Sequence, residues 1–314
     1  MKNILLTIAA ALLVGCGESQ QSEAKPVEPV AEVPARPSAP PVEAKPVEPV
    51  AEESRTRQPK KLSEIDYDLL TAAKNGNIND VKSSLAAGAN INAIAWRFDR
   101  GRTPLNQAVT YKHTNVVEYL INIGADINQL DKYGESPVGM AIRYKDYTVT
   151  KMLIDAGANV NISEKNGKKP IHFSVDMELM EITKLLIATG VNVNTKTKKS
   201  IGALTALHLA CKKGSIKFSK LLIEAGADIE QKNSKLIGSW APIHEASYRN
   251  HKLIVELLIS KGANVNIQSS GFSNNFGQQP ILTPLDVAKR FPEIADLLRK
   301  HGGKTGEELK AEEK

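Results

Sequence analysis

Cysteine is almost absent from this chain of 314 residues, which contains only Cys16 and Cys211. Neither suggests a disulfide scaffold. Aromatic residues make up only 5% of the chain, which fits helical repeats better than a β-sandwich. No HExxH, CxxC, EF-hand loop or nucleophile-elbow motif occurs, so the sequence offers no metal site and no catalytic constellation. We therefore expect no enzyme activity, no cofactor and no small-molecule substrate.

One enzyme alternative involves Cys211, which follows His208 by three residues in a helical pattern. A thiol and an imidazole at this spacing could form a nucleophile and its base. The sequence supplies no third group to orient the histidine, and a small buried residue is expected at this position. We therefore expect Cys211 to be an unreactive core thiol.

Long hydrophobic runs are missing as well. Ile4 to Val14 form an apolar run of eleven residues, preceded by Lys2. This run is too short to cross a bilayer, which takes about 20 residues. It fits the apolar region of a secretory signal peptide, with Lys2 as the positive region before it. The run ends in Leu13-Val14-Gly15-Cys16, which resembles the lipobox of bacterial lipoproteins.

The lipobox resemblance implies that residues 1–15 are removed and that Cys16 becomes the N-terminus, with its thiol carrying a diacylglycerol. Two or more acyl chains give stable membrane attachment, whereas one chain gives marginal binding. The same resemblance implies that Gly17, in place of an aspartate after the cysteine, favours the outer membrane. We expect an exported protein, lipid-anchored in the cell envelope and facing the periplasm or the outside. The alternatives are an ordinary signal peptide with an incidental cysteine, or a short membrane anchor.

Residues 17–62 differ in composition from the rest and hold nine of the sixteen prolines. The segment EAKPVEPVAE at 23–32 recurs unchanged at 43–52. Spaced prolines favour polyproline II and prevent helix or sheet, and too few apolar residues are present to form a core. We expect a disordered, Pro-rich tether that holds the rest of the chain away from the membrane. A proline-rich ligand for an SH3-like domain or for the cell wall is the alternative.

The rest of the chain is repetitive. The phrase Gly-Ala-Asn-Ile-Asn at 88–92 returns with small changes at Gly124, Gly157, Gly190, Gly226 and Gly262, at intervals of 36, 33, 33, 36 and 36 residues. Such a period indicates a stack of similar supersecondary units. Thr followed by Pro, as at 103–104, predicts a helix N-cap and first turn, and the recurring glycine predicts a helix end. Between them, Val116, Leu120 and Ile121 form an apolar stripe that recurs in later units.

The openings Thr103-Pro104-Leu105 and Thr205-Ala206-Leu207-His208 resemble the ankyrin repeat, as does the closing Gly-Ala-Asn phrase. The resemblance covers residues 66–303 and implies an all-α solenoid of stacked helix-turn-helix units with β-hairpin-like loops. We place about seven repeats in residues 63–303, with polar replacements in the end units, and a fraying, charged tail at 304–314. In this family the histidine of the opening stabilises the turn, which accounts for His172, His208 and His244.

The loops between units are the predicted binding surface, because the resemblance implies binding through loops and first helices. The six loops contain eleven Lys and Arg residues and four Asp and Glu residues, which gives them a net charge of +7. The net charge of the whole chain is +6. Both tryptophans lie there, and Trp with Arg is typical of interface hot spots. The candidate partner-binding residues are Trp96, Arg97, Phe98, Arg100, Tyr133, Lys199, Lys235 and Trp240. The alternative is a solvated face on which the tryptophans pack against neighbouring loops.

These features together predict a membrane-tethered protein–protein interaction module that captures a partner in the cell envelope, an acidic protein or a glycan. The acyl chains supply local concentration and the repeats supply selectivity. A surface-exposed or host-directed effector is the alternative, as is a protein that binds the cell wall. Nucleic acid is not expected, because an exported protein meets little of it, although basic loops can contact phosphate.

Overall fold

The computed structural model describes residues 62–95, 99–164, 167–234, 239–269, 273–274, 277–278 and 281–314. All of them belong to the compact unit Arg57–Lys314. The signal peptide, Cys16 and the Pro-rich tether lie outside the described residues, and the predictions about them stay predictions. No helix among the described residues is long and apolar enough to span a bilayer.

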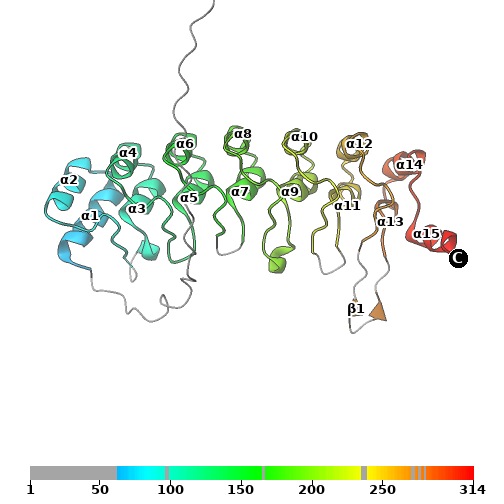
Figure 1. The fold of residues 1–314 in the computed structure, drawn as a ribbon, viewed down its shortest axis with the longest axis horizontal. Helices are drawn as coiled ribbons and strands as arrows, with labels where there is room; N and C mark the ends of the chain where they lie inside the picture. Colours follow the sequence, from blue (N-terminus) through cyan, green and yellow to red (C-terminus); the bar gives the residue numbers. More distant parts are fainter. Residues whose placement is uncertain are drawn as a thin grey trace, which may run out of the picture. The chain divides into compact units, whose positions relative to one another are not determined.

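Seven helical pairs follow one another along the described part of the chain. The first helices of the pairs are α1 (Glu64–Asn75), α3 (Pro104–Thr110), α5 (Pro137–Arg143), α7 (Pro170–Asp176), α9 (Ala206–Lys213), α11 (Pro242–Tyr248) and α13 (Pro284–Val287). The second helices are α2 (Ile78–Ala86), α4 (Thr114–Asn122), α6 (Tyr147–Asp155), α8 (Met180–Ala188), α10 (Ile216–Glu224), α12 (Lys252–Ser260) and α14 (Pro292–Lys300). Figure 1 shows the pairs side by side, with the second helices along one side and the connecting loops along the other. The predicted all-α solenoid is confirmed.

Short elements occur in three of the loops. The turns η2 (Asp99–Gly101) and η3 (Lys199–Ile201) are single 3₁₀ turns. In the longest loop, β1 (Ser273–Asn274) pairs antiparallel with β2 (Gly277–Gln278). The expected β-hairpin character is therefore found in this loop.

Each pair begins and ends as the local sequence predicts. In the second pair, the Thr103 hydroxyl accepts a hydrogen bond from the Asn106 amide at 3.2 Å, and Pro104 occupies the first turn of α3. After α4, Gly124 has φ of +89°, a left-handed conformation that glycine adopts without steric cost. The Ala125 amide then bonds to the Leu120 carbonyl at 2.9 Å, which uses one of the unpaired carbonyls at the helix end.

The core lies between neighbouring pairs. One leucine of each of five consecutive second helices is fully buried and contributes to one continuous cluster: Leu120, Leu153, Leu186, Leu222 and Leu258. Burying a side chain of this size contributes roughly 1.5–3 kcal/mol relative to leaving it exposed. A single pair has no other element against which to bury this stripe, so the pairs are stable only as a stack.

The opening histidines form the expected turn contacts. In α7, His172 Nδ1 accepts the Lys169 amide at 3.1 Å and Nε2 lies 3.0 Å from the Thr195 carbonyl of the next loop. His208 and His244 make the same pair of contacts. Burial lowers the pKa of both His172 and His244 to about 4, so both are neutral at pH 7. In the second pair Asn106 replaces histidine, and its Nδ2 donates to the Gln129 carbonyl at 3.2 Å.

The closing Asn and Asp residues connect the units through a polar ladder. Within each closing phrase, one side-chain oxygen accepts the amide two residues on, as Asn159 does for Asn161 at 2.9 Å. The second residue accepts an amide of the next unit, as Asn161 does for Asn192 at 3.3 Å. The ladder continues through each unit as far as the Lys304 amide, which donates to Asn266 at 2.7 Å. The recurring Asn and Asp residues thus set the register of neighbouring units.

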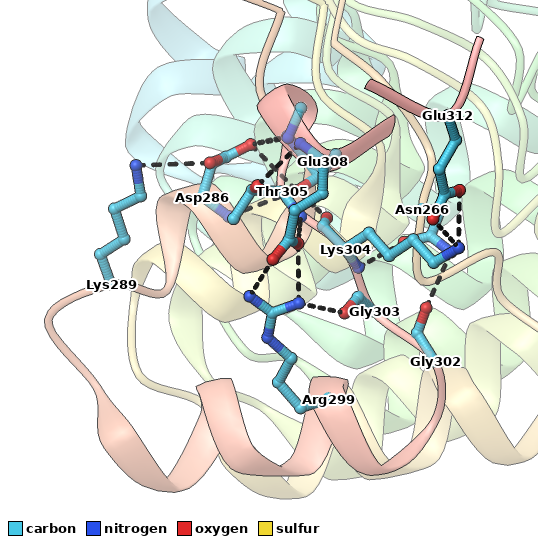
Figure 2. Close-up of polar contacts among 12 residues, drawn as sticks. Asn266, Asp286, Lys289, Arg299, Gly302, Gly303, Lys304, Thr305, Glu308 and Glu312 are labelled. Atoms are coloured by element: carbon cyan, nitrogen blue, oxygen red, sulfur yellow. Dashed lines mark hydrogen bonds and ion pairs between the residues drawn. The ribbon is translucent and has the colours of Figure 1, made fainter. Parts of the chain in front are cut away.

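The C-terminal segment differs from its prediction, because it forms a further helix, α15 (Gly306–Glu312). Figure 2 shows how it is held: Arg299 forms two bonds to Glu308, at 2.7 and 2.8 Å, and the Gly306 amide donates to Asp286 at 2.8 Å. Thr305 caps the helix, and Glu308 accepts the Thr305 amide, as the histidines do in earlier openings. The prediction of a fraying tail at 304–314 is therefore wrong, and α15 has the opening contacts of an eighth first helix.

Candidate interaction surface

The loops between units are called finger loops here: residues 93–102, 129–135, 162–168, 195–204, 231–240 and 267–282. The described parts of these loops lie to one side of the helical rows in Figure 1. The predicted residues Trp96, Arg97, Phe98 and Lys235 lie outside the described residues, so their part in the surface stays a prediction.

The structure brings two of the predicted residues together, one from each of the first two finger loops. The Arg100 guanidinium lies over the Tyr133 ring, 5.4 Å from its centroid, and Tyr133 is 44% exposed. The Lys132 amide donates to the Arg100 carbonyl at 2.9 Å, which joins the two loops. Arg100 has φ of +62°, an uncommon conformation for a residue with a side chain. An exposed cation over an aromatic ring can bind both carboxylate and apolar groups of a partner.

Lys199 lies apart from this pair, in the fourth finger loop. It begins η3, and its side chain is exposed. Nearby, Lys196 Nζ donates to the Lys232 carbonyl of the fifth finger loop at 2.8 Å. The fourth and fifth loops are therefore joined, as the first and second are.

Trp240 is not available to a partner. Its side chain is only 1% exposed, and its ring centroid lies 5.2 Å from that of Tyr248 and 6.1 Å from that of His244. Two hydrogen bonds hold this residue: the Trp240 amide donates to the Asn233 side-chain oxygen Oδ1 at 2.9 Å, and the Asn233 amide donates to the Trp240 carbonyl at 2.8 Å. The indole therefore lies against α11. The placement of Trp240 among the partner-binding residues is wrong, and the packing alternative holds for it.

A second row of side chains was missed from the sequence. It comprises the ends of six first helices, α1 to α11, and the turns that follow them, and is called the turn row here: residues 74–76, 110–112, 143–145, 176–178, 212–214 and 248–250. It holds seven basic residues (Lys74, Lys112, Arg143, Lys145, Lys212, Lys213 and Arg249) and two acidic ones (Asp176 and Glu178). It also holds Tyr111 and Tyr248, which are 45% and 50% exposed. The spacing from each helix start could have identified this row, since its residues recur at one position of the first six units.

Arg143 joins the turn row to the finger loops. Its guanidinium lies 2.8 Å from Glu135 and 2.9 Å from Glu164, and it covers the Phe173 ring at 5.1 Å. Glu164 is buried and also accepts the amide and hydroxyl of Ser136, at 3.2 and 3.0 Å. Burial raises the pKa of the Glu164 carboxyl above its usual value, although Arg143 and Ser136 act in the opposite direction. Arg143 is thus fixed in one orientation with a quarter of its side chain exposed.

A second set of contacts continues the connection into the next units. Lys168 of the third finger loop pairs with Asp176 at 2.9 Å, and Lys213 lies 3.9 Å from the same carboxylate. The finger loops and the turn row therefore form one continuous surface across units three to five.

The remaining thiol is not exposed on this surface. Cys211 is fully buried, and burial raises the pKa of its thiol to about 12, so it carries no thiolate at neutral pH. Among the described residues, no group of three His, Cys, Asp or Glu side chains could hold a metal ion.

The comparisons with known proteins agree with this geometry. A family model described as ankyrin repeats in three copies matches residues 69–164, 140–233 and 171–269. The chain belongs to the ankyrin-repeat family, whose members are typically interaction modules and not enzymes.

One protein is similar to this chain in sequence and one solved structure is similar to it in fold. The chain is 43% identical over 65 residues to YahD of Escherichia coli (strain K12), whose name describes it as an ankyrin repeat protein. That match covers 20% of this chain and 30% of YahD, so it spans less than a third of that relative. The crystal structure of the human ASB11 ankyrin repeat domain is similar with a TM-score of 0.56 and 24% identity, covering 75% of this chain and 98% of that domain. At that identity the likeness concerns the fold alone.

Proposed function

We propose that this chain is a lipid-anchored interaction module of the bacterial cell envelope, which captures a protein partner on its finger loops and turn row. The observation that carries the proposal is the composition of this continuous surface. It is rich in Lys and Arg and bears exposed tyrosines, and arginine and aromatic side chains are enriched in protein interfaces. Membership of the ankyrin-repeat family supports a protein as the partner. The basic character of the surface favours an acidic one.

The anchor is proposed from the sequence around Cys16. Acyl chains on its thiol would confine the repeats to a membrane surface, and the Pro-rich residues 17–62 would hold them away from it. Confinement raises the effective concentration of the repeats for any partner in the same compartment. The proposal places the module at the outer membrane, facing the periplasm or the outside.

Cell fractionation tests the anchor. In the Cys16→Ser variant we expect the protein to leave the membrane fraction, because the residue that would carry the lipid is gone. Cys211→Ala is the matched control, since it removes the other cysteine and keeps the proposed anchor. Membrane pelleting of Cys16→Ser equal to that of the wild type would contradict the lipoprotein proposal.

Site-specific photo-crosslinking in intact cells tests the capture surface. A photoreactive residue in place of Tyr133 or Tyr111 is expected to give crosslinks to a partner, which mass spectrometry then identifies. The same residue in place of Lys151, on the exposed side of α6, is the control. Equal crosslinking from all three positions would mean that the finger loops and turn row are not the binding surface.

Two further measurements decide between variants of the proposal. Cleavage of the repeats by protease added to intact cells would place them outside, as expected for a host-directed effector. Retention on purified sacculi, undiminished by Arg100→Ala, would indicate a cell-wall ligand that does not use the finger loops.

A further inference from the structure

We propose that Lys112 and Lys145, in the turn row, are partner-binding residues, and that they recognise an acidic, extended segment of a polypeptide. This inference rests on the proposed function, because it assumes that a protein is captured on the surface to which both lysines belong. It adds the residues that the capture uses and the chemistry of the segment that is captured.

The argument begins with the backbone of six equivalent turns, each joining the first and second helix of a pair. The residue at the turn is Gly76, Lys112, Lys145, Glu178, Gly214 or Asn250. All six have positive φ, between 57° and 77°. Glycine adopts this left-handed conformation freely and Asn tolerates it, whereas other side chains are disfavoured. Two lysines at such positions therefore oppose the local preference of the backbone.

Packing explains where glycine is required. A Cβ atom on Gly76 would lie 2.4 Å from the His113 ring of the next unit, and one on Gly214 would lie 2.5 Å from the His251 ring. The units that follow Lys112 and Lys145 have Asp146 and Leu179 at the position of that histidine. A side chain is thus permitted at these two turns. The available space does not by itself explain why lysine occurs at these two turns, because glycine or asparagine would fit the same backbone with less strain.

The surroundings of the two lysines indicate a ligand of negative charge. Both side chains are exposed, and neither forms an ion pair with any residue in the described part of the chain. In the first three units the turn row contains Lys74, Lys112, Arg143 and Lys145 and no acidic residue. The nearest acid of the turn row, Asp176, is already paired with Lys168 at 2.9 Å. Two adjacent units therefore present unneutralised positive charge, which matches carboxylates in a partner.

The neighbouring tyrosines favour a polypeptide over other polyanions. Each lysine directly follows a tyrosine, Tyr111 or Tyr144, and Tyr111 is 45% exposed. Lys74 of the preceding unit lies 5.7 Å from the centroid of the Tyr111 ring. Tyrosine supplies apolar contact area with a hydroxyl at low entropic cost, which suits mixed acidic and apolar side chains. The Tyr-Lys pairs recur in adjacent units, so an extended segment crossing the units would meet both.

A direct test uses the full-length protein in detergent and a fluorescent oligoglutamate of about 12 residues, long enough to cross about four helix spacings. Binding is measured by anisotropy at low salt. For the double variant Lys112→Gly, Lys145→Gly we expect affinity to fall about fivefold or more, as two charge contacts are lost. Its unfolding temperature is expected to stay the same or to rise by up to about 3 °C, because backbone strain is relieved.

Two single variants at equivalent turns are the controls. Asn250→Gly changes the same backbone position without changing charge, and its affinity is expected to equal that of the wild type. Glu178→Gly removes an acidic side chain from the turn row and is expected to bind the probe more tightly. A lower affinity together with unchanged or higher stability is a combination that a purely structural role of the lysines would not produce.

Three results would overturn the inference. The first is unchanged affinity of the double variant while Arg100→Ala or Lys199→Ala binds more weakly, which leaves the proposed function intact. The second is a fall of several degrees in the unfolding temperature of the double variant, which makes the lysines structural. The third is equal affinity for a DNA oligomer of the same charge with the same sensitivity to both lysines, which makes the surface a general polyanion site.

Discussion

The second helices and the turn row both face solvent, but their charges are arranged differently. The seven second helices carry eight basic and eight acidic residues, whereas the turn row carries seven basic residues and two acidic ones. The second helices also pair their own charges, as in Lys151–Asp155 at 2.6 Å and Lys252–Glu293 at 2.9 Å. Exposed pairs of this kind contribute little to stability and leave no net field for a partner.

This difference indicates that, within one repeat, the second helix serves mainly for packing and the turn row and finger loops serve for binding. A second helix buries its apolar stripe and neutralises its outer side, which suits an element whose role is to hold neighbouring units together. The turn row and finger loops keep their charge, and their buried contacts hold exposed side chains in place, as Glu164 does for Arg143. Changes in the second helices should therefore affect stability first, and changes in the turn row should affect binding first.

The largest effect is expected from Leu153→Ala in α6, whose side chain is fully buried between units. Loss of its packing and the cavity left behind should lower the free energy of unfolding by about 2–5 kcal/mol. Equilibrium denaturation in urea measures this. Lys151→Ala on the exposed side of the same helix is the control and should leave the transition unchanged. If Lys151→Ala lowered the stability as much as Leu153→Ala does, the surface charges of the second helices would contribute to stability as much as their buried apolar stripes.

The sequence predicted the helices well because their signals are local. Thr103 and Pro104 determine a helix start from adjacent residues, and Gly124 determines an end in the same way. The number of repeats and the apolar stripes followed from the period alone. The buried histidines followed from the family resemblance.

The surface was predicted less well because it depends on contacts between distant residues. Trp240 is buried and its amide is bonded to Asn233, seven residues earlier, and composition gives no sign of this. Arg143 meets Glu164 only when neighbouring units stack. The segment of α15 looked like a charged tail, although Thr305 and Glu308 have the spacing of a capping box, a signal that was available.

The next effect concerns pH and the opening histidines, which belong to the first helices. The folded pKa of His172 is about 4, below its value of 6.5 in an unfolded chain. Between pH 6.5 and about 4, His172 is therefore protonated in the unfolded chain and neutral in the folded chain. The contribution of His172 to the free energy of unfolding is fully present above pH 6.5 and is lost as the pH falls to about 4. The loss is of the order of 3 kcal/mol.

The variant His172→Asn tests this, because Asn106 already fills the same position in the second pair. We expect stability at pH 7 to fall by about 1 kcal/mol and its decline between pH 6.5 and 4 to become shallower. Denaturation at several pH values measures both. An unchanged pH dependence would mean that the pKa of His172 is not lowered in the fold. Leu153→Ala should lower the free energy of unfolding equally at every pH, without changing its pH dependence. The two variants therefore distinguish the effect of packing from the effect of titration.

A smaller effect of opposite sign is expected from Glu164. Its pKa is raised in the fold, so its contribution to stability is present below the pKa of the unfolded chain and is lost as the pH rises through the folded pKa. In Glu164→Gln, which resembles the protonated form, this dependence should disappear. The hydrogen bonds to Ser136 can persist with the amide oxygen, so the change at pH 7 should be about 1 kcal/mol or less. A large loss of stability at pH 7 would show instead that the charge of Glu164 is required to hold Arg143.

The smallest effect is expected at α15, which has the opening contacts of a first helix. Its main side-chain contacts are polar: Arg299 with Glu308, and Lys304 with Glu312 at 2.6 Å. The Arg299 guanidinium, which hydrogen-bonds to Glu308, lowers the pKa of that carboxyl to about 2. In Arg299→Ala we expect faster hydrogen exchange in α15 and an unchanged unfolding midpoint for the stack, while Lys310→Ala on the same helix should change neither.

High salt should have a similar but weaker effect on the wild type, because the pairs are exposed. If Arg299→Ala instead lowered the midpoint as Leu153→Ala does, polar contacts at a first helix would stabilise the stack as strongly as a buried stripe, and the division of roles between the two helices of each pair would be wrong.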